Sequence, residues 1–166
     1  MNFDSLHDTK EVILREHAIT VHADIYSKYV DLEGWHDNVF EIDISADANL
    51  DGSNYWVPTL MYATATPGTI GSYAAVAAAD MDYEVVVAAG TSTFYSNTVL
   101  PTINSTSVDS VILRARYKGT ARYVCVFMDV TTAGSYPTGV LGIRATVSRG
   151  RTKPEDTYAV TIGTVS

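Results

Sequence analysis

The stretch VILRARY, residues 111–117, decides the fold of this chain. Its apolar residues recur at every second position: Val111, Leu113, Ala115 and Tyr117. Arginines stand at two of the positions between them. A period of two places alternate side chains on opposite faces of a β-strand. The stretch therefore predicts a strand with one face in a core and the arginines on a wetter face.

Two further strands are predicted downstream. RYVCVFMDV, residues 122–130, is apolar at both alternating sets of positions, which is typical of a central strand buried on both faces. VLGIRATVS, residues 140–148, alternates again, with one apolar face: Leu141, Ile143, Ala145 and Val147. Turn residues at 118–121 and 131–139 join the three strands. Short connections of this kind favour an antiparallel meander.

The N-terminal half follows the same pattern. In NVFEIDIS, residues 38–45, Phe40, Ile42 and Ile44 alternate with polar residues. Residues 56–65 and 81–89 are further strand candidates, and Pro58 marks the first as an edge strand or the site of a bulge. The alanine-rich stretch 73–80 predicts a short helical turn or a tightly packed loop. Regularly spaced strands with little helix predict an all-β fold, an antiparallel β-sandwich, jelly roll or barrel.

A length of 166 residues fits one domain. Residues 1–18 are polar and weakly patterned, so we expect an extended N-terminal arm. Residues 19–147 form the expected β-sandwich domain. Residues 148–166 form a C-terminal tail, in which 158–163 could add a last strand to this domain or to a neighbouring molecule.

The net charge of −8 hides an asymmetry. Residues 1–109 carry 16 acidic and 3 basic residues, or −13, and residues 110–166 carry 8 basic and 3 acidic residues, or +5. An acidic total argues against non-specific nucleic-acid binding, because affinity for phosphates depends on Lys and Arg. We expect the two regions to neutralise one another within the fold or between subunits, with a free basic patch as the alternative.

The sequence contains no apolar run of the roughly 20 residues that span a bilayer. It begins without the apolar core of a signal peptide, and its single cysteine excludes an internal disulfide framework. These features favour assembly in a cytoplasm.

Candidate metal and catalytic sites are incomplete. Asp47, Asn49 and Asp51 precede Gly52 as in the start of a calcium loop, but Pro58 occupies the place of the bidentate glutamate. An Asx-rich turn is the favoured interpretation. His22 with Asp24 and His36 with Asp37 could contribute zinc ligands, but no third ligand is spaced to join them, so ordinary strand and turn residues are the favoured interpretation.

The sequence also gives no support for nucleophilic catalysis. Cys125 stands among apolar residues, which is typical of an inert buried thiol. No serine stands in a nucleophile motif such as G-x-S-x-G. We therefore expect no catalytic residue, no cofactor and no metal, and a protein that is not an enzyme.

The candidate contact residues lie in the two chain ends. Each end holds an apolar cluster that an arm would bury on a neighbour: Val12, Ile13 and Leu14 in one, Tyr158, Val160 and Ile162 in the other. Arg149 and Arg151 add positive charge to the second. The eleven tyrosines favour protein interfaces, and a sugar-binding surface stays open as an alternative.

Two parts of the sequence resemble a known family. A polar lead, NFDSLHDTKEVI, precedes HAITVHADIYSKYVDLEG, whose small-residue strand ends in an Asp-Leu-Glu-Gly turn. Later an RYVCV strand, a small-residue hairpin and the strand GIRATV follow in order. Over residues 3–34 and 113–148 this pattern resembles the jelly-roll cement, or decoration, proteins of tailed bacteriophage capsids.

The resemblance implies a jelly roll that binds the outer surface of a coat-protein shell and clamps adjacent subunits. Its implied partners are the major capsid protein and copies of itself, as a dimer or trimer, with no nucleic acid and no membrane. The implied location is the outside of a virion assembled in the host cytoplasm. The alternatives are a carbohydrate-binding β-sandwich module and a β-domain associated with a phage tail or fibre.

Overall fold

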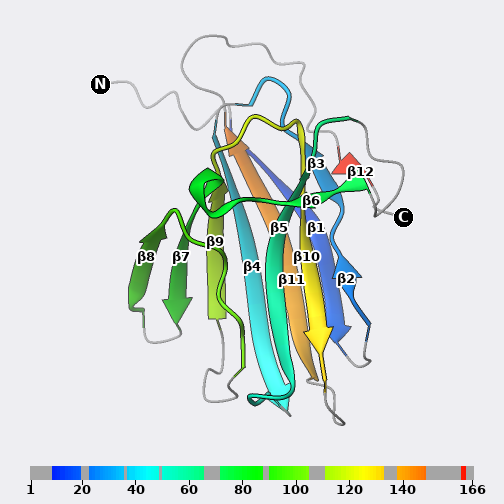
Figure 1. The fold of residues 1–166 in the computed structure, drawn as a ribbon, viewed down its shortest axis with the longest axis vertical. Helices are drawn as coiled ribbons and strands as arrows, with labels where there is room; N and C mark the ends of the chain where they lie inside the picture. The colour runs from blue at the N-terminus through cyan, green and yellow to red at the C-terminus, as the bar shows by residue number, and fades with distance from the viewer. Residues whose placement is uncertain are drawn as a thin grey trace.

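The computed structural model is an antiparallel β-sandwich, in which two sheets lie face to face (Figure 1). It describes residues 9–19, 23–35, 37–48, 50–65, 72–87, 90–104, 111–132, 138–148 and 162–163. The predicted all-β sandwich is confirmed. No helix in these residues is long and apolar enough to cross a membrane.

The first sheet has six strands. In spatial order they are β1 (Thr9–Ile19), β11 (Thr138–Ser148), β4 (Asp37–Ala48), β9 (Val111–Tyr117), β7 (Met81–Val87) and β8 (Ser92–Ser96). Every neighbouring pair is antiparallel. The edges are β1 on one side and β8 on the other.

The second sheet is built on shorter strands. In spatial order they are β12 (Ile162–Gly163), β3 (Tyr29–Asp31), β10 (Tyr123–Thr131), β5 (Tyr55–Ala63) and β6 (Ala74–Ala75), and β2 (Ile25–Tyr26) pairs with β10 beside β3. One turn of 3₁₀-helix, η3 (Ala78–Asp80), follows β6. The alanine-rich stretch thus contains the short helical turn that its composition predicts.

The predicted strand faces are confirmed. Leu113 and Ala115 of β9 are fully buried, while Arg114 and Arg116 are exposed. The predicted inward faces of β4 and β11 are likewise buried: Phe40, Ile42, Ile44, Leu141, Ile143, Ala145 and Val147.

The predicted meander of the last three long strands is wrong. β9 and β11 belong to the first sheet, separated by β4, whereas β10 lies in the second sheet. The chain therefore crosses the sandwich twice between residues 117 and 138. A period of two fixes which face of a strand is buried, but it is the same for a strand that pairs with its neighbour in sequence and for one that crosses over.

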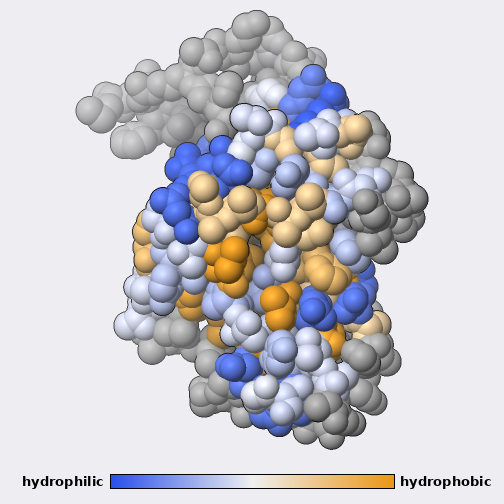
Figure 2. Space-filling view, viewed as in Figure 1, coloured by the Kyte–Doolittle hydropathy of each residue, from blue (hydrophilic) through white to orange (hydrophobic). Residues whose placement is uncertain are grey.

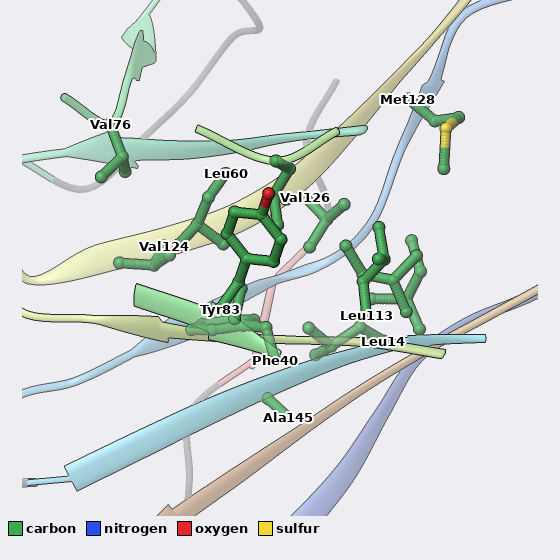
Figure 3. Packing of buried hydrophobic residues seen from close by; sticks show 14 of the residues in the cluster. Leu14, Phe40, Leu60, Val76, Tyr83, Leu113, Val124, Val126, Met128 and Ala145 are labelled. Carbon is green, nitrogen blue, oxygen red and sulfur yellow. The ribbon is translucent and has the colours of Figure 1, made fainter. Parts of the chain in front are cut away.

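The core is a single layer between the sheets, seen from close by in Figure 3. Phe40, Leu113 and Ala145 project from the first sheet, and Leu60 and Val124 project from the second. This is the interdigitation expected of two sheets whose inner faces are both apolar.

The segment predicted as an N-terminal arm enters the sheet at Thr9. β1 pairs with β11 along its whole length, and its register shifts between Ile13 and Arg15. This bulge places an extra residue in β1, so the alternation is broken and the strand pattern is hidden in the sequence. The boundary at residue 18 is therefore corrected, and residues 1–8 lie outside the described part.

β1 also closes one side of the sandwich. The backbone N–H of Lys28 donates to the Leu14 carbonyl at 3.3 Å, and the Arg15 guanidinium donates to the Tyr26 carbonyl at 2.9 Å. Both bonds join the bulge to the segment around β2, which belongs to the other sheet. The bulge thus turns an edge strand toward the opposite layer.

The predicted C-terminal tail begins where β11 ends, at Ser148. Within it, Ile162 and Gly163 form β12 and pair with Val30 and Tyr29 of the same chain. Of the two alternatives for the last strand, pairing with its own domain is the one observed. The remaining residues of the tail, 149–161 and 164–166, lie outside the described part.

Two local predictions are confirmed. Asp51 forms an Asx turn, in which its carboxylate accepts the backbone N–H groups of Ser53 at 2.7 Å and Asn54 at 2.8 Å. Pro58 pairs with Met128 of β10 on one side. β5 as a whole lies between β10 and β6, but on the β6 side its described partners are Ile103 at Trp56 and β6 at Met61 and Tyr62, so the sheet has an edge only locally, at Pro58.

Candidate functional site

The outer face of the second sheet carries a second apolar cluster. β10 produces it, because Val124, Val126 and Met128 point into the sandwich and Tyr123 and Cys125 point outward, yet all five are buried. The doubly apolar pattern of residues 122–130 therefore predicted a strand buried on both faces correctly. What covers its second face is a set of side chains from distant parts of the chain.

We call this surface the aromatic face. It consists of Tyr26, Tyr29, Met61, Ala63, Tyr73, Tyr123, Cys125 and Phe127. Figure 2 shows apolar residues gathered across the middle of this view, over β5, β6 and β10, with hydrophilic residues toward both ends.

The aromatic rings are held against one another. The ring centroids of Tyr26 and Phe127 lie 4.5 Å apart, and Tyr29 meets Tyr123 edge-on at 5.4 Å. The Arg122 guanidinium lies 5.1 Å from the centroid of the Tyr123 ring. Such pairs add about 0.5–1.5 kcal/mol beyond the area that they bury. The rings therefore already contact one another before anything binds to the face.

The centre of the aromatic face is unsuited to covalent chemistry. Burial raises the pKa of the Cys125 thiol to about 12, so the thiolate is scarce at neutral pH. Burial also raises the pKa of the Tyr73 hydroxyl. The expectation of a buried thiol at Cys125 is confirmed.

The outer face of the first sheet is charged instead. Arg114 of β9 bonds Glu41 of β4 at 3.0 Å and faces Glu84 of β7 at 3.6 Å. Arg144 of β11 lies 3.8 Å from the other oxygen of Glu41 and 4.0 Å from Asp43. These side chains form a ladder of alternating charge across four strands.

The charge asymmetry of the sequence is resolved inside the fold. In the nine ion-pair contacts of the described residues, every base comes from residues 110–166 and every acid from residues 1–109. The expected neutralisation within the fold is confirmed for these five bases, which are Arg114, Arg116, Lys118, Arg122 and Arg144.

A cleft of about 540 Å³ opens at one end of the sandwich. Trp35, Arg116, Lys118 and Arg122 are among its lining residues. Its cations are already paired: Arg116 with Asp37 at 2.9 Å, Lys118 with Asp82 at 2.7 Å, and Arg122 with Asp31 at 2.6 Å. An anionic ligand would have to displace a carboxylate, so the cleft is poorly suited to phosphate or sulfate.

The candidate metal residues are not brought together in the part of the chain that is described. Those residues contain no group of three or more His, Cys, Asp or Glu side chains that could hold a metal ion. Asp24 instead accepts the Val130 backbone N–H at 3.3 Å, and Asp37 is bound to Arg116. His22, His36 and Asn49 lie outside the described residues.

The predicted contact residues lie in different surroundings. Leu14 belongs to the core, Val12 packs against it, and only Ile13 faces solvent, with 56% of its surface exposed. The interpretation of Val12 and Leu14 as contacts on a neighbour is therefore corrected, because β1 pairs with β11 and turns both side chains onto their own sandwich. Ile162 lies in β12, and the other four predicted contacts are outside the described residues: Arg149, Arg151, Tyr158 and Val160.

Sequence reasoning missed the composition of the aromatic face. Tyr26, Tyr29, Tyr73 and Tyr123 are spread over about a hundred residues and meet only through strand pairing. The available signal was the doubly apolar β10, which shows that some layer must cover its outer side. No family model, curated protein or solved structure matches this chain.

Proposed function

We propose that this chain is a structural docking protein of a capsid exterior, a cement protein that binds a coat-protein shell through its aromatic face. The observation that carries the proposal is the difference between the two broad faces. One is a ladder of ion pairs closed within the chain, and the other gathers Tyr, Phe and Met side chains.

The composition of the aromatic face suits a protein partner. Aromatic residues and Met are enriched in protein interfaces, and charged residues are depleted at interface centres. Tyr26, Tyr29, Met61 and Phe127 are half-buried, so each keeps surface that a partner can cover. Because their rings already pack together, binding would immobilise few side chains.

The choice of a capsid as the partner rests on the sequence resemblance. The same resemblance implies the jelly-roll connectivity, the clamping of coat subunits and the location on the virion exterior. A non-enzymatic role agrees with the site as described. The carboxylates near the end cleft neutralise its cations, and the one buried thiol is held protonated.

The first test is the coding neighbourhood, where the proposal expects a gene for a major coat protein, and the second is binding to shells of that protein. We expect the wild-type protein to sediment with such shells, and the double variant Tyr26→Ser/Met61→Ser to lose occupancy at least tenfold. Val140→Ser, which changes an exposed apolar residue on the other broad face, is the matched control and should bind normally. Melting curves of each variant establish that it is folded.

The rival function, a carbohydrate-binding module, is tested by the same variants. Tyrosine faces also stack on sugar rings, so the proteins should be titrated with polysaccharides as well as shells. Binding to a polysaccharide that disappears in Tyr26→Ser/Met61→Ser, with no binding to shells, would replace the cement proposal by the glycan one.

A further inference from the structure

β8 is an edge strand without the usual protection. All five of its residues are exposed, and in the described structure β7 is its only strand partner. Figure 1 shows β7 and β8 at one side of the molecule, beyond β9. An edge of this kind presents unpaired backbone N–H and C=O groups that can pair with another strand.

Exposed apolar side chains gather at this edge. Phe94 is 67% exposed, Tyr95 39% and Val99 57%. They are three of the five large apolar side chains that the described residues expose, the others being Ile13 and Val140. Phe94 and Tyr95 are successive residues of β8 and lie on opposite faces, Phe94 opposite Glu84 and Tyr95 against Tyr83, so the edge exposes apolar surface on both of its sides.

The opposite edge of the same sheet shows what a protected edge looks like. The sequence of β1, TKEVILREHAI, carries four charged residues, and its register contains the bulge between Ile13 and Arg15. Charges and bulges are the devices by which proteins prevent edge-to-edge pairing. The sequence of β8, STFYS, has no charge and no proline, and its ladder with β7 runs without a register shift.

β8 is nevertheless held in strand geometry. At its end, the Asp82 carboxylate accepts hydrogen bonds from the Ser96 hydroxyl at 2.8 Å, the Asn97 backbone N–H at 3.1 Å and Lys118 at 2.7 Å. The ring of Tyr95 stacks on that of Tyr83 at 4.7 Å. A strand fixed before binding loses little conformational entropy when a partner is added.

We propose that β8 is the contact edge between two copies of this chain, paired antiparallel about a two-fold axis so that their first sheets become one continuous sheet. A second copy is the occupant because β8 is uncharged and complements itself in this register. With Phe94 on the axis, Ser92 faces Ser96 and Thr93 faces Tyr95, so no charge meets a like charge. This matters because each copy carries a net charge of −8.

The two-fold arrangement also satisfies both open edges at once and closes the assembly. Pairing β8 of one copy with β1 of the next would instead leave free edges and grow into filaments. The charges and the bulge of β1 oppose that alternative.

The test is the mass in solution of the full chain and three variants. We expect light scattering at micromolar concentration to give twice the 18.0 kDa of one chain. Phe94→Lys, which sets two ammonium groups against each other on the axis, should give a monomer. Ile13→Lys, a matched change of an exposed apolar residue on the other edge, should stay a dimer.

A rescue experiment tests the register. Phe94→Glu alone should also be monomeric, but an equimolar mixture of Phe94→Lys and Phe94→Glu should recover the dimer, because Lys then faces Glu. A monomeric wild type, a dimeric Phe94→Lys, a monomeric Ile13→Lys or a mixture that stays monomeric would each overturn the proposal. Shell binding is measured separately on the Phe94→Lys monomer, so failure of the β8 contact is distinguishable from failure of the cement function.

Discussion

Tyr117 shows how single side chains fix the connection between the two sheets. It ends β9, and its hydroxyl oxygen accepts the backbone N–H of Ala121 at 2.9 Å across the turn that leads to β10. Its ring lies directly over Gly119, where any side chain would collide with it. The Tyr117 side chain therefore explains the glycine at position 119, which the sequence pattern alone does not explain.

We expect Tyr117→Phe to lower the free energy of unfolding by about 1–3 kcal/mol, because it leaves a buried N–H without its acceptor. Urea denaturation measures the change. Tyr95→Phe, in exposed β8, is the matched control and should change stability by less than about 0.5 kcal/mol. Equal effects of the two substitutions would show that the hydroxyl of Tyr117 does not hold the turn.

Asp82 makes the stability of the β8 end depend on pH. Hydrogen bonds from Lys118 and Ser96 lower its pKa to about 2. The unfolded chain binds this proton near pH 3.9, so the contribution of Asp82 is complete above about pH 4 and is lost as the pH falls toward 2. Unfolding measured between pH 2 and 5 should show a shallower acid loss for Asp82→Asn than for the wild type. Identical pH slopes would contradict the assignment.

At the scale of elements, periodicity predicted the strands and their buried faces but not their partners. β9, β10 and β11 were each identified from apolar alternation, yet they alternate between sheets instead of forming a meander. The same limit hid the aromatic face, since its tyrosines come from β2, β3, β10 and the segment before β6. The face on which a side chain lies is set by the local alternation along its strand, whereas the choice of the neighbouring strand depends on the packing of the whole core.

β1 shows a second limit of prediction from sequence periodicity. Leu14 lies in the core, 2% exposed, beside the outward-facing Ile13, and the register shift that follows interrupts the alternation by which the strand would be identified. We expect Leu14→Ala to cost about 2–5 kcal/mol of stability, as other large-to-small core substitutions do.

Ile13→Ala is the control for that substitution and should stay within about 0.5 kcal/mol of the wild type, because the side chain is already exposed. Thermal or urea unfolding of both variants makes the comparison. A Leu14→Ala variant as stable as Ile13→Ala would restore the interpretation of this segment as an arm.

At the scale of the whole molecule, the structure shows that the acidic and basic parts of the sequence are not separate charged surfaces. The bases of residues 110–166 that are described are held by acids of residues 1–109, so they add no free positive charge to a chain whose net charge is −8. Two copies, each with a net charge of −8, therefore repel each other as whole molecules. An uncharged strand such as β8 is the place where they can meet at the least electrostatic cost.

Repulsion between two acidic copies fixes the sign of the salt effect on self-association. Screening shortens the range of repulsion to about 10 Å at 0.1 M salt and about 3 Å at 1 M, so added salt should lower the dissociation constant of the dimer. Sedimentation at a series of salt concentrations measures it. The mixed dimer of Phe94→Lys with Phe94→Glu is the matched control, because its new ion pair is itself screened and should offset the gain. A wild-type dimer that dissociates as salt rises would mean that ion pairs hold the two copies together, and the contact would then lie on a charged surface and not on β8.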